Sequence, residues 1–142
     1  MNTELEKERL TTLAQELALA TAQRTARWEL RDADFYSWTA PEGTVTIASR
    51  DRDGEPPYEL TVFSSGAEKV DELASELLVD DQPAPWNEPL AELYRIARRS
   101  GLGADDIIDA LLERLREAHG DARTEQRSFL GRARAGSASE ST

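Results

Sequence analysis

Residues 35–78 constrain the fold more than any other stretch, because strand-like alternation, glycine-containing turns and a helix-like pattern follow one another there without a gap. Apolar and polar residues alternate in residues 44–49 and again in residues 58–62, the period of two expected for half-buried strands. Between them, residues 51–57 contain an Asp-Gly pair, which suits a tight reversal, and two prolines, which stop a hydrogen-bonded ladder. These features predict a β-hairpin with a long tip.

A third strand is predicted upstream of this hairpin. Residues 40–43, Ala-Pro-Glu-Gly, have the proline and glycine positions of a turn, so residues 35–39 should run back against residues 44–49. Residues 28–34 form either a connection or a further short strand. The sequence therefore predicts a three-stranded antiparallel meander, which needs a helix against it to be stable.

A helix is predicted directly after the meander. Ser65 and Glu68 have the spacing of a capping box, in which each side chain accepts from the backbone amide of the other residue. Val70, Leu73 and Leu77 then recur at helical spacing. Residues 65–78 are accordingly expected to form an amphipathic helix that packs on the sheet.

The N-terminal segment, residues 3–27, is predicted to be helical. Leu10, Leu13 and Leu17 follow the three-four spacing of a coiled-coil seam. One interpretation is that this stripe covers the second face of the meander. The other is that it pairs with a partner helix or with a second copy, which would make the protein a homodimer.

The predicted fold class is α+β: an N-terminal helix, a three-stranded antiparallel meander, a helix, and then a C-terminal αα-hairpin and a disordered tail. Residues 1–79 form the first unit, and residues 80–86, with two prolines and no periodicity, form a linker. Residues 87–119 form the helical hairpin, packed on or beside the first unit. Residues 120–142 are poor in apolar residues and are predicted to be disordered.

The predicted hairpin resembles a helix-turn-helix over residues 90–116, because a small residue, Ala97, is followed by Gly101 in the turn and apolar residues in the second helix. The start of that second helix would enter the major groove of DNA. Three carboxylates occupy this start, at Asp105, Asp106 and Asp109, and they would face phosphates. Nucleic acid is therefore not the expected partner.

Composition favours a protein partner as well. The 142-residue chain holds 28 Asp and Glu against 17 Lys and Arg, a formal net charge of −11, which repels nucleic acid and anionic membranes and favours a basic protein surface. Its charged N-terminal segment has no hydrophobic signal core, and no apolar run is long enough to cross a bilayer. A cytoplasmic location is expected. Because the bases are almost all arginine, with Lys7 and Lys69 as the only lysines, a GC-rich bacterial genome is favoured.

No catalytic motif stands out. The only histidine, His119, lies at the predicted end of the last helix, and the chain has no cysteine, so no Ser-His or Cys-His arrangement is predicted. Residues 51–55 share the Asp-x-Asp-Gly pattern of a calcium loop but lack its later ligands. We expect no enzyme activity, no metal site and no cofactor.

The sequence thus predicts a small acidic, non-catalytic protein-interaction module, an adaptor or accessory subunit of a bacterial complex. Two alternatives stay open: a DNA-binding regulator with a degenerate helix-turn-helix at 90–116, and an acidic inhibitor that imitates nucleic acid. The candidate partner-binding residues are those of the first helix, the hairpin tip, the start of the last helix and the tail: Leu10, Leu13, Leu17, Asp51, Asp53, Asp105, Asp106, Asp109, Phe129 and Leu130.

Overall fold

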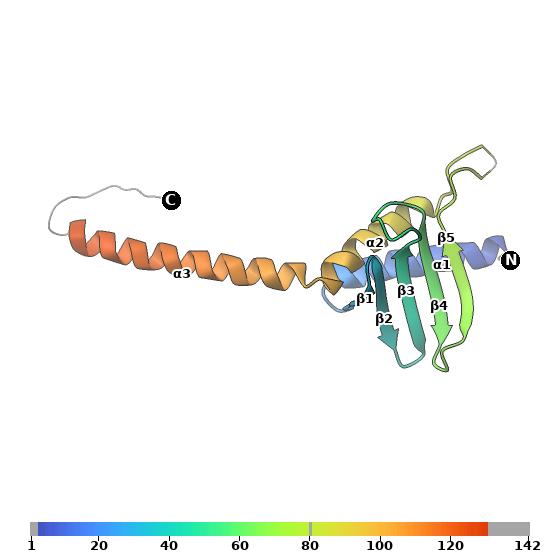
Figure 1. Ribbon diagram of the computed structural model, residues 1–142, viewed down its shortest axis with the longest axis horizontal. Coiled ribbons are helices and arrows are strands. Elements are labelled where there is room, and N and C mark those ends of the chain that lie inside the picture. The colour runs from blue at the N-terminus through green and yellow to red at the C-terminus, as the bar shows by residue number, and fades with distance from the viewer. Residues whose placement is uncertain (1–2, 80, 131–142) are drawn as a thin grey trace. The chain divides into compact units, whose positions relative to one another are not determined.

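The computed structural model describes the backbone of residues 3–79 and 81–130, and the side chains of residues 3–79 and 81–120. The chain divides into two compact units, Met1–Gly103 and Ala104–Thr142. The first unit holds α1 (Glu4–Ala22), a β-sheet and α2 (Asn87–Gly101), and the second holds α3 (Ala104–Leu130), as Figure 1 shows. The predicted α+β class is confirmed.

The sheet is an antiparallel meander of five strands in the order β1-β2-β3-β4-β5, so the prediction of three strands was wrong. The strands are β1 (Glu29–Asp32), β2 (Phe35–Ala40), β3 (Gly43–Ser49), β4 (Tyr58–Ser64) and β5 (Lys69–Ala74). Tyr36 pairs with Ile47, Ile47 with Leu60, and Leu60 with Leu73, so these four side chains form one row across the sheet. All four are buried in the core.

The helix predicted at residues 65–78 does not form, and β5 takes its place. The Ser64 hydroxyl accepts hydrogen bonds from the amides of Gly66 (3.2 Å) and Glu68 (3.3 Å), while the Ser64 amide donates to the Glu68 carbonyl at 2.8 Å. Ala67 adopts a left-handed conformation with φ of 69°. The chain therefore reverses in a tight turn, and the next residues pair with β4 because its edge offers unpaired backbone groups.

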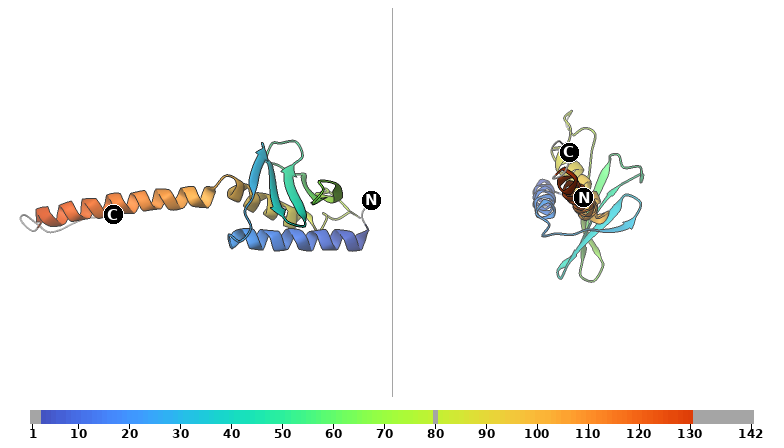
Figure 2. Two further views of the ribbon diagram at one scale, coloured as in Figure 1. Left: turned by 90° about the horizontal axis from the view of Figure 1, so that it is seen from below. Right: turned by 90° about the vertical axis from the view of Figure 1, so that its left-hand side faces the viewer.

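The helix α1 begins at a capping box, as Thr3 accepts from the Glu6 amide and the Glu6 carboxylate accepts from the Thr3 amide. It ends at Ala22, five residues before the predicted end. Figure 2 shows α1 and α2 on the same side of the sheet, and α1 packs chiefly on α2. The expectation that α1 covers the second face of the sheet was wrong.

The helix α2 packs directly on the sheet through a buried stripe of Leu90, Leu93, Tyr94 and Ala97. Its last residue, Gly101, lies so close to the sheet that a Cβ atom would come within 2.6 Å of Tyr36 Cδ1. Leu90 to Ala97 spans the two turns that a helix needs to place four apolar residues on one face. Burial of this face makes α2 the central element of the first unit.

The buried tryptophans join the helices to the sheet. The Trp28 indole donates to the Thr21 hydroxyl of α1 at 2.8 Å, and its amide donates to the Ser100 hydroxyl of α2 at 2.9 Å. The Trp86 indole donates to the carbonyl of Ala74 in β5 at 2.7 Å. Each indole N–H thus has the partner that a buried tryptophan requires.

The helix α3 follows Gly103, whose φ of 69° suits glycine at a helix junction. It continues to Leu130, so residues 120–130 of the predicted tail are helical, and residues 131–142 lie outside the described part of the chain. Across residues 3–79 and 81–130, no helix combines the length and apolar character needed to cross a membrane.

The burial pattern of β5 predicts that two substitutions to alanine lower the free energy of unfolding by different amounts. Leu73 is 3% exposed and Val70 is 60% exposed, although both belong to the apolar stripe of the helix that was expected there. Leu73→Ala should lower the free energy of unfolding by about 2–5 kcal/mol, and Val70→Ala by less than about 0.5 kcal/mol. Urea denaturation measures both values. Similar losses for the two variants would contradict the strand and favour a helix.

Candidate protein-interaction site

The predicted seam of α1 lies inside the first unit. Leu10 and Leu17 are buried in the core, and Leu13 is half-buried against it. Their partners are residues of α2 and the sheet rather than another chain. This seam therefore serves the fold, and a homodimer through α1 would have to use other side chains.

The two predicted acids of the hairpin tip lie in the loop between β3 and β4, and both are exposed. The Asp53 carboxylate accepts hydrogen bonds from the Glu55 amide at 2.9 Å and from the Ser49 hydroxyl at 3.0 Å. Both bonds hold the pKa of Asp53 below its usual range, and the bond from the Glu55 amide has the larger effect. Asp53 thus shapes the loop, while Asp51 is exposed at its surface.

The remaining predicted residues belong to α3. Asp105 and Asp106 lie in the first turn, where the helix dipole favours carboxylates, and Asp109 follows one turn later. The backbone of Phe129 and Leu130 is helical, and their side chains lie outside the described residues. The structure thus distributes the predicted residues over three separate elements rather than gathering them into one site.

One apolar hollow on the first unit was not predicted from the sequence. It has a volume of about 650 Å³ and lies between the β3–β4 loop, the chain after β5 and the first two turns of α2. We call it the α2 groove. It is lined by Arg50, Pro56, Pro57, Tyr58, Ser75, Glu76, Leu77, Asn87, Glu88 and Ala91.

Side-chain hydrogen bonds hold the walls of the α2 groove together. The side chain of Asn87 bonds twice to the backbone of Glu76: its Oδ1 accepts from the Glu76 N–H at 2.9 Å, and its Nδ2 donates to the Glu76 carbonyl at 2.6 Å. A neighbouring strand would make the same pair of bonds. The Ser75 hydroxyl accepts from the Tyr58 amide at 3.1 Å. These bonds fix α2 to the chain after β5 and fix that chain to β4.

Several polar groups that line the groove are therefore occupied by the protein itself. Arg50 also pairs with Glu59, at 2.7 Å between Nε and Oε2. The surface left for a ligand is mainly apolar, and Leu77 at its edge is 88% exposed, the most exposed large apolar residue among those described. Such a surface binds apolar side chains by removing them from water.

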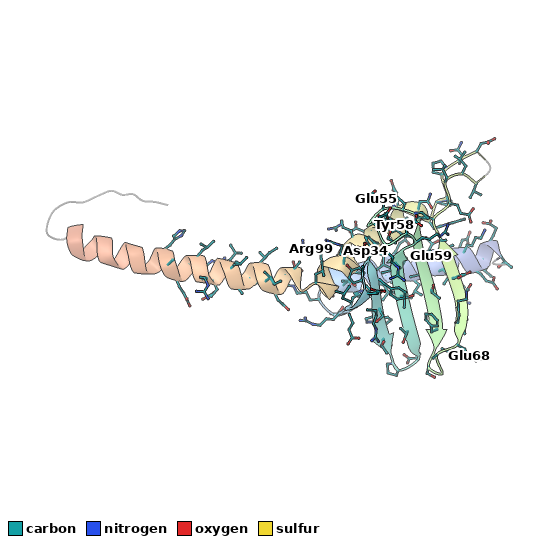
Figure 3. The ribbon with its side chains drawn as sticks, viewed as in Figure 1. Asp34, Glu55, Tyr58, Glu59, Glu68 and Arg99 are labelled. Atoms are coloured by element: carbon teal, nitrogen blue, oxygen red, sulfur yellow. The ribbon has the colours of Figure 1, made fainter. Side chains whose placement is uncertain are left out.

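Tyr58, which lines the groove, belongs to a cluster of three tyrosines with Tyr94 and Tyr36. The Tyr58 ring stacks on the Tyr94 ring with centroids 4.5 Å apart, and the Tyr36 ring meets the Tyr94 ring edge-on at 6.0 Å. The Tyr94 hydroxyl donates to Asp34 Oδ1 at 2.6 Å. Figure 3 shows Tyr58 and Glu55 at one end of the sheet and Glu68 at the other. The cluster therefore joins the start of β4, which follows the β3–β4 loop, to α2 and to the β1–β2 turn.

The chemistry of this cluster favours a structural role. Burial is the main cause that raises the pKa of Tyr36, Tyr58 and Tyr94 above the ordinary value of 10.0, and for Tyr94 the bond to Asp34 raises it further. All three hydroxyls are therefore neutral at physiological pH. Those of Tyr58 and Tyr94 donate hydrogen bonds, to the Gly54 carbonyl and to Asp34 Oδ1. Within the described part of the chain, no group of three His, Asp or Glu residues is placed to hold a metal ion.

Two signals in the sequence could have pointed to the α2 groove. The Pro56-Pro57 pair was assigned only a turn-breaking role, and Leu77 was assigned to the apolar face of the helix that does not form. The groove depends on where β5 ends, and that end is set by pairing with β4. A local pattern does not contain this information.

Comparison of the chain with protein families, curated proteins and solved structures finds no match.

The Tyr94–Asp34 hydrogen bond predicts a pH-dependent stability. The stability that neutral Tyr94 provides is fully present below pH 10.0, where Tyr also stays neutral in the unfolded chain, and is lost as the pH rises above that value. Tyr94→Phe should lower the free energy of unfolding by about 1–3 kcal/mol at neutral pH and should reduce the loss of stability at alkaline pH. Denaturant titrations at neutral pH and at about pH 11 measure both effects. A variant that loses as much stability as the wild type on alkalinisation would contradict this role.

Proposed function

We propose that this chain is a non-catalytic protein-interaction module, an adaptor or accessory subunit, that binds an apolar segment of a partner protein in the α2 groove. The observation that carries the proposal is the position of Leu77, which is 88% exposed beside a mainly apolar hollow of about 650 Å³. An apolar hollow that opens to solvent, with a large apolar side chain in its lining, is the kind of contiguous apolar surface that typically marks a binding site.

The energetics fit Leu77 as the main apolar contact of a small interface. Full burial of one leucine side chain contributes about 1.5–3 kcal/mol. The pyrrolidine rings of Pro56 and Pro57 and the methyl group of Ala91 add apolar area next to it. Because the groove walls are held by hydrogen bonds within the protein, little conformational entropy is lost when a ligand binds. Leu77 is the expected hot spot of the interface.

The charges around the groove specify the partner further. Glu76 and Glu88 lie in its wall, and the one base there, Arg50, is paired with Glu59. The whole chain has a formal net charge of −11. The favoured partner segment therefore presents an apolar side chain next to Lys or Arg. Its association rate should fall as the salt concentration rises, because long-range attraction is screened.

A protein partner is favoured over nucleic acid. In α3, Asp105 and Asp106 occupy the first turn, which a helix-turn-helix would present to DNA. Carboxylates there repel phosphates, and the α2 groove offers apolar surface rather than a basic one. Acidity alone would also suit an inhibitor that imitates nucleic acid. Binding by such an inhibitor would depend on carboxylates and would tolerate loss of Leu77.

A matched pair of substitutions tests the groove. Leu77→Glu places a charge at the proposed hot spot, and Leu19→Glu places the same charge at a 53% exposed leucine of α1, outside the groove lining. Wild-type protein, Leu77→Glu and Leu19→Glu are used as baits in the native lysate. We expect a protein that is retained by the wild type and by Leu19→Glu, with retention by Leu77→Glu reduced about 30-fold or more.

Three outcomes would count against the proposal. Equal retention of the same partner by all three baits would place its binding site elsewhere. Recovery of nucleic acid that high salt removes would favour the DNA-binding alternative. Loss of partner with both variants would mean that charge, rather than the groove, decides binding. Circular dichroism and urea denaturation of each variant confirm that both substitutions leave the fold intact.

A further inference from the structure

The helix α3 presents a continuous apolar stripe. Five large side chains on one face of its first four turns expose between 41% and 55% of their surface: Ile107, Ile108, Leu111, Leu112 and Leu115. Contiguous apolar surface of this kind on a helix indicates a missing partner.

The spacing is that of a coiled-coil heptad. Ile108 and Leu115 fall at position a, and Leu111 falls at position d, with the small residues Ala104 and Ala118 at the d positions on either side. In the heptad that starts at Ile108, a β-branched residue at a and leucine at d favour two parallel strands, and the next a position holds Leu115. The backbone of α3 is helical over 27 residues, almost four heptads, and its large apolar a and d residues span residues 108–115.

The two apolar residues beside the a/d positions can also pack on each other in a dimer. Ile107 falls at position g and Leu112, five residues later, falls at position e. In a parallel pair of helices, the g residue of one chain lies beside the e residue of the following heptad on the other chain. Ile107 of each copy would thus pack on Leu112 of the other. This contact covers the two residues that an a/d seam alone would leave exposed.

The charges of α3 agree with this arrangement. Asp106 and Glu113 fall at position f, and Asp109 and Arg116 fall at position b, which all point away from the seam of a dimer. An amphipathic helix that lies on a membrane instead carries Lys and Arg on its polar face. Residues 104–117 hold five acids against two arginines, which does not suit an anionic membrane.

We propose that two copies of this chain associate through their α3 helices as a parallel, in-register two-stranded coiled coil. Residues 104–118 form the seam, with Ile108, Leu111 and Leu115 at its centre. The inference is independent of the α2 groove, which belongs to the other unit. Leu77→Glu should therefore leave the oligomeric state unchanged. A chain that dimerises in this way would present two α2 grooves to its partner and bind with avidity.

Analytical ultracentrifugation of the full chain tests the association. The wild type is expected to sediment as a dimer at micromolar concentration. Leu111→Asp should raise the dimer dissociation constant about 30-fold or more, because it puts a charge at the centre of the seam. Ala110→Asp is the matched control: it adds the same charge at an exposed position c of the same turn and should remain dimeric.

Disulfide trapping tests the orientation, and the absence of cysteine from the chain makes each introduced thiol unique. In a parallel in-register pair, a d residue meets its own copy, so Ala104→Cys and Ala118→Cys should each form a covalent dimer on mild oxidation. The cysteine of Ala110→Cys lies at position c, away from the seam, and should not form a covalent dimer.

A monomeric wild type would overturn the proposal, and it would mean that the stripe is covered by residues 1–103 of the same chain or by another molecule. A dimer that survives Leu111→Asp would place the interface elsewhere. A dimer that loses stability with Leu111→Asp but is trapped by neither Ala104→Cys nor Ala118→Cys would contradict the parallel register.

Discussion

Packing of α2 on the sheet is the interaction on which the rest of the first unit depends. Leu90, Leu93 and Ala97 are fully buried in this contact. The outer side of α2 gives α1 its packing surface, and the start of α2 forms one wall of the α2 groove. In this two-layer arrangement the helices cover one face of the sheet. The opposite face carries small hydroxyl residues: Ser37 and Thr46 are buried there and Thr61 is half-buried. Arg31 covers part of this face, since its Nε donates to the Ser37 hydroxyl at 2.8 Å.

Local patterns in the sequence predict most elements of this fold. The strands β2, β3 and β4 follow from alternation and turn chemistry, and α1, α2 and the start of α3 follow from helical periodicity. The segment after β4 was misassigned because two local interpretations fit it. The helix prediction used Ser65 as the cap, whereas in the structure the preceding residue, Ser64, accepts from the amides two and four residues later and closes a tight turn. Pairing with β4 decides between them, and this is a tertiary contact that the pattern does not contain.

The candidate site was harder to predict than the fold, for the same reason. The leucine seam of α1 was read correctly as apolar, but an apolar stripe does not reveal whether the covering surface is in the same chain. Leu10 and Leu17 are covered by the core, whereas the equivalent stripe of α3 is exposed in its own unit. The α2 groove combines residues from the β3–β4 loop, the end of β5 and α2. These segments meet only because the hairpin at residues 64–68 reverses the chain.

The central claim is that the α2 groove binds the partner protein, and amide hydrogen exchange tests it most directly. Exchange is measured for the chain alone and for its complex with the protein retained by the wild-type bait. We expect slower exchange in the complex at residues 75–78 and 87–91, because burial of the groove walls suppresses their local opening. Unchanged exchange in these two segments, with new protection on α1 or on the outer face of the sheet, would contradict the claim.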